Sequence, residues 1–200
     1  MNDETQSVAD LLSDVASASV SPASGTVGGV VGAMGTALCE MVCIHLREAE
    51  VNTDADLAEL RRTLESDRER LLTLAEADAA VVEAVFGADG VEEDPTMDER
   101  ATEVPLALAE TCLAVLETAT VVTGVADRPV VVDAGIGASF VDAALRSALF
   151  TARINAASAD DESFRAETER RATDIEAAAD DAVRLATQNA GTDRIDRSAE

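Results

Sequence analysis

The longest apolar stretch of the chain covers residues 26–46 and follows a turn marked by Pro22. It reads TVGGVVGAMGTALCEMVCIHL, in which Glu40 is the only acidic residue and no Arg occurs. A helix without a polar face has to be covered on all sides, so we expect a buried central helix made largely of small residues. The turn before it exposes backbone N–H groups at the helix N-terminus, where an anion or the polar edge of a ligand can bind.

Helical periodicity on either side of this stretch predicts two amphipathic helices. The first covers residues 3–17, and the other begins after a cap within Asn52–Asp54 and runs to about Phe86. The apolar stripe of the latter consists of Leu57, Leu60, Leu64, Leu71, Ala75, Val82 and Phe86. Asp78 falls on the same stripe. A carboxylate that faces a core is costly, and two interpretations remain open: a hydrogen bond between helices, or a proton-transfer group whose pKa is raised by burial.

Three more helices are predicted in the second half of the chain. A capping box of Thr96 and Glu99 starts the first of them, and Pro105 is expected to kink it. Asp133 is expected to be the N-cap of the next helix, and the last one spans about residues 160–188. Its apolar stripe is predicted to contain Phe164, Ile175, Ala179, Ala182 and Leu185.

No segment alternates between apolar and polar residues over a useful strand length. The predicted fold class is therefore all-α: a single domain over residues 1–200, with roughly six helices packed around the buried small-residue helix and a frayed tail over residues 191–200. Arg153 and Asn155 stand out as polar residues in an apolar helical segment. A structural interpretation pairs Arg153 with a buried carboxylate such as Glu40 or Asp78.

The net charge of −25 excludes several classes of partner, because nucleic acids and anionic membrane surfaces attract positive proteins. All 15 basic residues are Arg, and the acidic residues are spread over the whole chain. We therefore expect a folded protein adapted to high salt, in which screening relieves the repulsion between carboxylates. The apolar stretch is nearly long enough to span a bilayer, but Glu40 and its glycines favour a buried helix in a protein without a membrane partner.

Three cysteines (Cys39, Cys43 and Cys112) lie inside apolar helical segments. An odd number of buried cysteines indicates reduced thiols and a cytoplasmic protein. Cys39, Cys43 and His45 are the only residues that suggest metal ligands, but His45 lies on a different helix face from Cys43 and no CxxC motif is present. Core packing is the favoured interpretation, and no metal site is predicted.

Four stretches, in order, resemble the cyclodeaminase/cyclohydrolase family. They are the Pro22 turn with its small-residue helix, LLTLAEADAAVVEAVF, ATEVPLALAE and VVDAGIGASFVDAALRSALFTARINAAS. The family includes the C-terminal half of formiminotransferase-cyclodeaminase and stand-alone methenyltetrahydrofolate cyclohydrolases. The resemblance implies an all-helical homodimer with a pocket for a reduced folate. Two reactions are implied: closure of 5-formiminotetrahydrofolate to 5,10-methenyltetrahydrofolate with loss of ammonia, and addition of water to the methenyl bridge to give 10-formyltetrahydrofolate. Both pass through a tetrahedral carbon between N5 and N10, so both need proton transfer but neither a metal nor a cofactor.

The resemblance also implies roles for individual residues. Asp78 matches the acidic signature of the family and is implied to be the general acid/base. Asp133 matches the Asp-Ala-Gly position and is implied to hold the pterin or a bridging water, whereas Arg153 and Asn155 are implied to orient the substrate. The rim of the folate pocket is expected to be formed by the turn that contains Pro22, Ser24, Gly25 and Thr26.

The sequence departs from the family pattern at three points. The turn Ala23-Ser24-Gly25-Thr26 has one glycine where the family has a run. The expected lysines and tyrosines after the central helix are absent, and Glu40, in place of a small residue, is expected to put a new carboxylate near the pocket. The alternative to a folate enzyme is therefore a catalytically inactive helical dimer of the same fold with a ligand-binding or interaction role.

Overall fold

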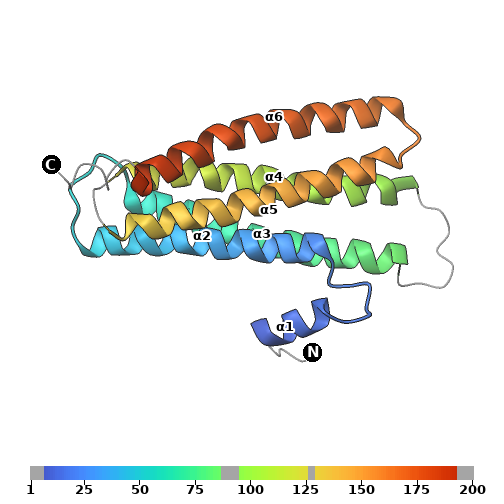
Figure 1. The fold of residues 1–200 in the computed structure, drawn as a ribbon, viewed down its shortest axis with the longest axis horizontal. Coiled ribbons are helices and arrows are strands. Elements are labelled where there is room, and N and C mark those ends of the chain that lie inside the picture. The colour runs from blue at the N-terminus through green and yellow to red at the C-terminus, as the bar shows by residue number, and fades with distance from the viewer. Residues whose placement is uncertain (1–6, 87–94, 126–128, 193–200) are drawn as a thin grey trace.

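The computed structural model describes residues 7–86, 95–125 and 129–192, which contain six α-helices and no strand. The helices are α1 (Val8–Val15), α2 (Ser24–Glu48), α3 (Leu57–Phe86), α4 (Pro95–Gly124), α5 (Val131–Ala157) and α6 (Glu162–Thr187), and a π-helical turn (Gln188–Thr192) follows α6. The five long helices run in alternating directions along the bundle (Figure 1). The predicted all-α fold class with roughly six helices is confirmed.

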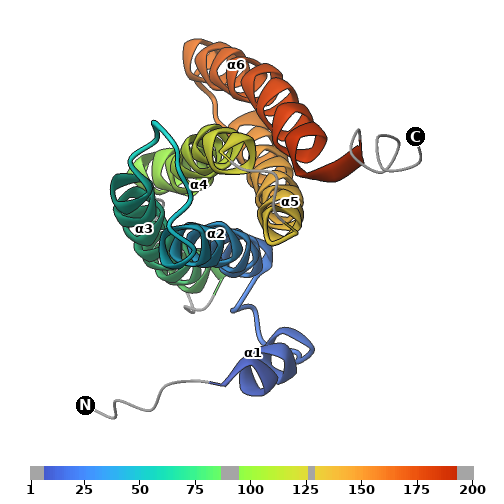
Figure 2. The same ribbon diagram turned by 90° about the vertical axis from the view of Figure 1, so that its left-hand side faces the viewer.

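The small-residue helix α2 lies between α3 and α5, and it also contacts α4 (Figure 2). Its glycines permit this arrangement because they let neighbouring backbones approach closely. The closest approach is between Gly35 of α2 and Gly137 of α5, where a Cβ on either glycine would lie 2.5 Å from the carbonyl oxygen of the other. The expectation of a buried central helix is correct for the side of α2 that faces this bundle.

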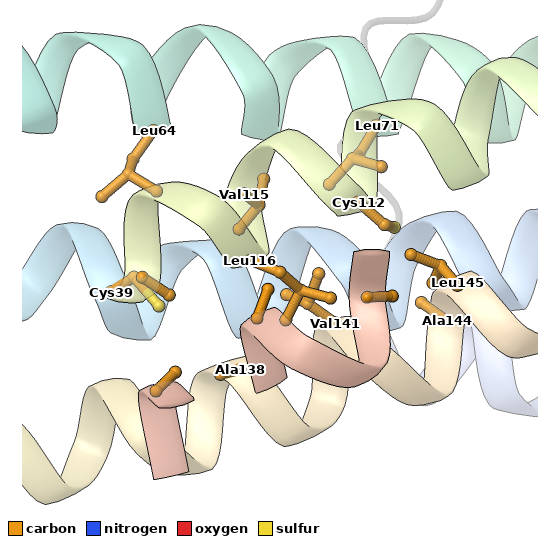
Figure 3. Packing of buried hydrophobic residues seen from close by; sticks show 14 of the residues in the cluster. Cys39, Leu64, Leu71, Cys112, Val115, Leu116, Ala138, Val141, Ala144 and Leu145 are labelled. Carbon is orange, nitrogen blue, oxygen red and sulfur yellow. The ribbon is translucent and has the colours of Figure 1, made fainter. Parts of the chain in front are cut away.

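The core is built from Leu, Val, Ala and Cys side chains of the five long helices, as Figure 3 shows for the segment around Leu116 and Val141. Cys39, Cys43 and Cys112 are fully buried and form no disulfide. Burial raises the pKa of Cys39 and of Cys112 to about 12, so these thiols are protonated at neutral pH. The cysteines are therefore packing residues, as the sequence indicated.

The first helix, α1, stands apart from the five-helix bundle on the side opposite α6 (Figure 2). Its capping box is formed by Ser7 and Asp10, and Val8, Leu12 and Val15 are all exposed. The amphipathic pattern of this segment therefore predicts the helix correctly, but the described part of the chain leaves the apolar side of this helix exposed.

Two predicted helix caps are wrong. The carboxylate of Asp56, rather than a residue of Asn52–Asp54, accepts hydrogen bonds from the N–H groups at the start of α3. Asp133 lies in the first turn of α5, and the N-cap is Val130, which provides no side-chain hydrogen bond.

The α4 helix continues through Pro105. The side chain of Thr96, on which the predicted capping box depends, lies outside the described part of the structure, as do the acidic loop 87–94 and the tail 193–200.

Arginine side chains hold α6 against the bundle. Arg146 and Arg153 of α5 pair with Asp180, Glu169 and Glu176 of α6, and Arg171 of α6 pairs with Glu103 and Glu110 of α4. The apolar face beneath these pairs consists mainly of alanines. Leu185, which the sequence placed on this face, is exposed, and Ala186 is buried instead.

Two helical segments are long and apolar enough to cross a membrane by length and composition alone, namely Ser24–Glu48 and Glu99–Gly124. In each, the most apolar window is 56% buried within the bundle. Core helices of helical bundles commonly share these properties, so the two segments are weak evidence for membrane insertion.

Candidate functional site

A pocket of about 470 Å³ lies at the end of the bundle where α2 and α4 begin and α3 and α5 end. Because the helices alternate in direction, four segments that are distant in the sequence meet at this end. Its lining residues are Val20, Ala23, Ser24, Gly25, Asp78, Val81, Val82, Val85, Ala101, Thr151, Asn155 and Ser158. We call it the Asp78 pocket, because Asp78 is the only charged residue in this lining.

Asp78 is buried, with 7% of its surface exposed, although it is ionisable. Its Oδ2 atom accepts a hydrogen bond of 2.8 Å from the backbone N–H of Thr26 and one of 3.1 Å from the Thr26 hydroxyl. The N–H of Thr26 belongs to the first turn of α2, where backbone donors lack partners within the helix and the helix dipole favours a negative charge. Asp78 of α3 thus stabilises the N-terminus of α2, as the hydrogen-bonding interpretation of its position predicted.

Burial raises the pKa of Asp78 above its ordinary value, and the two hydrogen bonds from Thr26 oppose this rise. No basic side chain pairs with Asp78 in the described part of the chain. A carboxyl group in this setting keeps its proton to a higher pH than a solvated aspartate does. The structure therefore gives Asp78 both a structural bond and the properties of a proton-transfer group, so the two interpretations of the sequence are compatible.

Gly25 makes this arrangement possible. A Cβ at position 25 would lie 2.1 Å from Oδ1 and 2.7 Å from Oδ2 of Asp78. Any larger residue would collide with the carboxyl group, because two heavy atoms that are not bonded do not approach so closely. Gly25, in the first turn of α2, is thus the glycine that the carboxyl group requires.

Asn155 reaches the pocket from the last turns of α5. Its Nδ2 donates a hydrogen bond of 2.6 Å to the carbonyl oxygen of Ala101 in α4. This bond holds the amide in place and occupies one of its N–H groups, so the other N–H and the amide oxygen are available to a ligand. Thr151 and Ser158 lie one helical turn before and after Asn155 and share its face. The sequence contains a signal for these hydroxyl groups, because Thr151 and Ser158 lie four residues before and three residues after Asn155.

The other predicted site residues are divided between this pocket and distant places. Ser24 and Gly25 line the pocket, and Thr26 reaches it only through Asp78. Pro22 is not among the lining residues, although its neighbour Ala23 is. The peptide bond between Ser21 and Pro22 is cis.

Arg153 does not reach the pocket and does not pair with Glu40 or Asp78. Its guanidinium group donates to Glu169 and Glu176 of α6, at 3.1 Å and 2.9 Å. Its role in this structure is therefore to hold α6. Arg153 and Asn155 are two residues apart and so point to different sides of α5, which their spacing in the sequence indicates. The contact of Arg153 with α6 could not be seen there, because it depends on where α6 packs.

Asp133 lies near the opposite end of α5. It precedes Asn155 by 22 residues, which corresponds to about 33 Å along a helix. Within one chain, Asp133 and Asp78 thus do not act on the same small ligand. The sequence placed them together only through the family resemblance.

Glu40 is also remote from the pocket, contrary to our expectation. Its carboxylate lies between Arg61 and Arg68 of α3, with N–O distances of 3.3 Å and 3.2 Å. Fourteen residues separate it from Thr26, so it lies about 21 Å further along α2. Glu40 therefore forms an ion-pair cluster between α2 and α3 and does not line the Asp78 pocket. In the described part of the chain, no group of three or more His, Cys, Asp and Glu side chains is arranged to hold a metal ion.

The fold and site together define an all-helical protein with a buried carboxyl group in a pocket at one end of the bundle. Residues 7–174 match the family model of formiminotransferase-cyclodeaminase, and the chain belongs to this family. It is 30% identical over 176 residues to a methenyltetrahydrofolate cyclohydrolase from Methylorubrum extorquens, an alignment that covers 81% of this chain and 85% of that protein.

Two further similarities support the assignment. The chain is 27% identical over 179 residues to formimidoyltransferase-cyclodeaminase from Sus scrofa, with 81% of this chain aligned to 32% of that longer protein. The fold matches the crystal structure of formiminotetrahydrofolate cyclodeaminase from Thermotoga maritima with a TM-score of 0.84 and 22% identity, over 93% of this chain and 96% of that one. The latter likeness establishes the fold.

Proposed function

We propose that this protein is a folate enzyme that acts at the bridge between N5 and N10 of tetrahydrofolate, as a methenyltetrahydrofolate cyclohydrolase or a formimidoyltetrahydrofolate cyclodeaminase. The observation that carries the proposal is Asp78, a buried carboxyl group that is raised in pKa and opens onto a pocket with no other charge in its lining. The names of two similar proteins supply the substrate class, because they include methenyltetrahydrofolate and formiminotetrahydrofolate.

Both reactions require a group that takes up a proton and returns it. In the cyclohydrolase reaction, water adds to the methenyl carbon and loses one proton, which gives a neutral hydroxyl intermediate. The bond from that carbon to N5 then breaks as N5 gains a proton, while the hydroxyl group loses its proton and becomes the carbonyl group of the 10-formyl product. In the cyclodeaminase reaction, N10 attacks the carbon of the protonated formimino group and loses its proton, which leaves an amino group on a tetrahedral carbon. This amino group gains a proton and leaves as ammonia, and the carbon becomes the methenyl cation between N5 and N10. Asp78 is proposed to accept the first proton and donate the second, which a carboxyl group with a raised pKa can do.

The remaining lining fits a flat ligand that carries hydrogen-bonding edges. Val81, Val82 and Val85 of α3 provide an apolar wall, and the amide of Asn155 provides a donor and an acceptor on the opposite side. We propose that Asn155, together with the Ser24–Gly25 turn, orients the pterin ring. Arg153 and Asp133 have no part in this site within one chain.

The test is a spectrophotometric assay of methenyltetrahydrofolate with the purified protein at high salt. Disappearance of the methenyl compound in water alone indicates cyclohydrolase activity, and its appearance from formiminotetrahydrofolate indicates cyclodeaminase activity. Failure of both reactions in the wild-type protein would contradict the proposal and support the inactive helical dimer.

We also propose that the protein is a homodimer, in which a second copy covers the exposed face of α2 and α5. Ile136, Phe140, Phe150 and Ile154 recur along one side of α5 at helical spacings and are exposed, as is Met34 of α2. All five of these exposed residues are uncharged, although the net charge of the chain is −25. Two such chains repel one another through their acidic surfaces, so an uncharged apolar face favours contact between copies.

The position of α1 supports the same partner. Val15 at the end of α1 lines a groove together with Val27 and Val31 of α2 and Ala143 and Ala144 of α5. The exposed apolar side of α1 therefore borders the α2/α5 face. A second copy that covers this face would also bury Val8 and Leu12, which have no cover within one chain.

A further inference from the structure

Thr26 contacts Asp78 in a way that distinguishes the two carboxyl oxygens. Both hydrogen bonds that Thr26 donates, one from its backbone N–H and one from its hydroxyl, end on Oδ2. No hydrogen bond to Oδ1 is formed by the described residues. An oxygen that accepts two hydrogen bonds is held as an acceptor, because a proton on it would have to displace one of the donors.

We propose that Thr26 is a positioning residue that fixes Oδ2 of Asp78, so that Oδ1 is the oxygen that exchanges the proton with the ligand. This inference rests on the proposed function for its ligand, but the geometry that it uses belongs to the protein alone. It also changes the role expected from the sequence, in which Thr26 was a substrate-binding residue of the turn before α2.

The surroundings of Oδ1 agree with this assignment. Gly25 has no side chain, and the place that its Cβ would occupy is taken by the Asp78 carboxyl group, with Oδ1 nearest at 2.1 Å. The carboxyl group is thus seated between Gly25 and Thr26 at the start of α2. Oδ2 is held there by two donors, whereas Oδ1 accepts no hydrogen bond from the residues that the structure describes.

Among the described residues, burial and the two hydrogen bonds from Thr26 are the influences on the pKa of Asp78, and no charged side chain of a neighbouring helix is one of them. The pocket receives Ser24 and Gly25 from α2, Ala101 from α4, and Thr151 and Asn155 from α5, all of which are uncharged. On α3 itself, the nearest acidic residues, Glu76 and Glu83, are exposed to solvent. Arg153 of α5 is engaged by α6.

The variant that tests the inference is Thr26→Val, which keeps the shape of the side chain and the backbone N–H but removes the hydroxyl donor. Thr36→Val is a matched control, because Thr36 is a buried threonine of the same helix whose hydroxyl bonds to the carbonyl oxygen of Gly32, at 2.8 Å. Thr26→Ser retains the hydroxyl and serves as the conservative variant.

Two measurements follow the consequences. Carbon-13 NMR of the aspartate side chains, with Asp78→Asn to assign the signal, reports the protonation of Asp78 without any substrate. Loss of a donor to the charged form raises the titration midpoint, so we expect the midpoint to move upward in Thr26→Val and to stay unchanged in Thr36→Val and Thr26→Ser. The pH profile of kcat/KM reports the pKa of the same group in the free enzyme. We expect this pKa to move upward in Thr26→Val as well.

A positioning role also separates kcat from KM. We expect kcat of Thr26→Val to fall about tenfold or more while KM stays within about twofold, because the hydroxyl does not touch the ligand. An unmoved NMR midpoint in Thr26→Val, or a large rise in KM with unchanged kcat, would overturn the inference. If the wild type turned over neither folate substrate, the proposed function would be overturned. The NMR titration would still decide the role of Thr26.

Discussion

Asp78 combines two influences that act on its pKa in opposite directions. Burial beneath the α2 N-terminus disfavours the charged form, whereas the hydroxyl and N–H of Thr26 favour it. Burial is the larger influence, so the pKa is raised. This balance distinguishes Asp78 from the many exposed acidic residues of the chain and makes it the candidate for proton transfer.

The raised pKa has a consequence for stability that can be measured without substrate. Because the folded state binds the proton of Asp78 more tightly than the unfolded state, this group favours folding at low pH. Its contribution is lost as the pH rises from the ordinary aspartate value through the raised value. We expect Asp78→Asn, which cannot ionise, to lack this loss and to be at least as stable as the wild type at pH 7.

Denaturant unfolding of the two proteins at several pH values checks this expectation. The difference in the free energy of unfolding between wild type and Asp78→Asn should shift in favour of Asp78→Asn as the pH increases. A difference that shifts in favour of the wild type with increasing pH would mean that the folded protein stabilises the carboxylate, and that the pKa is lowered.

At the scale of helices, the junction between α2 and α3 depends on Gly25. We expect Gly25→Ala to displace the Asp78 carboxyl group, to destabilise the fold by about 1–3 kcal/mol, and to lower turnover severely. Gly28→Ala provides a control from the next turn of the same helix, because a Cβ there would meet nothing within 4 Å. Alanine is the better helix former, so Gly28→Ala is expected to keep both turnover and stability, with a gain of up to about 1 kcal/mol.

Thermal unfolding and the folate assay compare the two variants. Equal effects of Gly25→Ala and Gly28→Ala on turnover would show that the contact between Gly25 and Asp78 is not needed for activity. A loss of turnover in Gly25→Ala alone would support the conclusion that the Asp78 carboxyl group has to lie against Gly25 at the start of α2.

The helices were predictable from sequence because their periodicity is local and repeated, and the burial of Asp78 followed from its place on an apolar stripe. The helix caps were less predictable, since Asp56 and Asn52–Asp54 offer competing capping residues a few positions apart. The ion-pair partners of Arg153 depend on where α6 packs, which no local sequence pattern shows. Glu40 and its two arginines likewise meet only because α2 and α3 are antiparallel neighbours.

The pocket was predictable only in part. Asp78, Gly25, Ser24 and Asn155 were expected at one site and do line it. Asp133 was expected there too, but the length of α5 separates it from the others. The valines of α3 and the hydroxyl groups of α5 were not expected, because their role in the lining depends on how α3, α4 and α5 converge.

At the scale of the whole molecule, charge is the dominant feature. The chain has 40 acidic and 15 basic residues, so its formal net charge is −25. Arginine pairs hold α6 to α4 and α5, and salt screens these attractions as well as the repulsion. We expect the repulsion to prevail because of the excess of acid, so the melting temperature should rise between 0.1 M and 2 M KCl, by about 2–4 °C for each kcal/mol gained.

Calorimetry at several salt concentrations measures this dependence. The Arg171→Gln variant removes the contacts of α6 with Glu103 and Glu110 and is expected to increase the requirement for salt. A melting temperature that is highest at low ionic strength would contradict adaptation to high salt and show that the arginine pairs prevail.

The dimer is tested by placing a charge on its proposed face. Phe140→Glu is expected to weaken association by at least about tenfold, because each copy would bury an unpaired carboxylate. Val121→Glu is a matched control, since Val121 on α4 is similarly exposed, at 44% against 45% for Phe140. Sedimentation equilibrium measures both; dissociation of the two variants to the same extent, or a monomeric wild type, would refute the proposed interface.

The central claim is that Asp78 transfers protons at the N5/N10 bridge of a reduced folate. The most direct measurement is the turnover of methenyltetrahydrofolate and of formiminotetrahydrofolate by the wild type and by Asp78→Asn, at high salt and with matched circular dichroism spectra. We predict turnover of at least one substrate by the wild type and a loss of about 100-fold or more in Asp78→Asn, in the range expected for a general acid/base. A folded Asp78→Asn variant with wild-type turnover would contradict the claim.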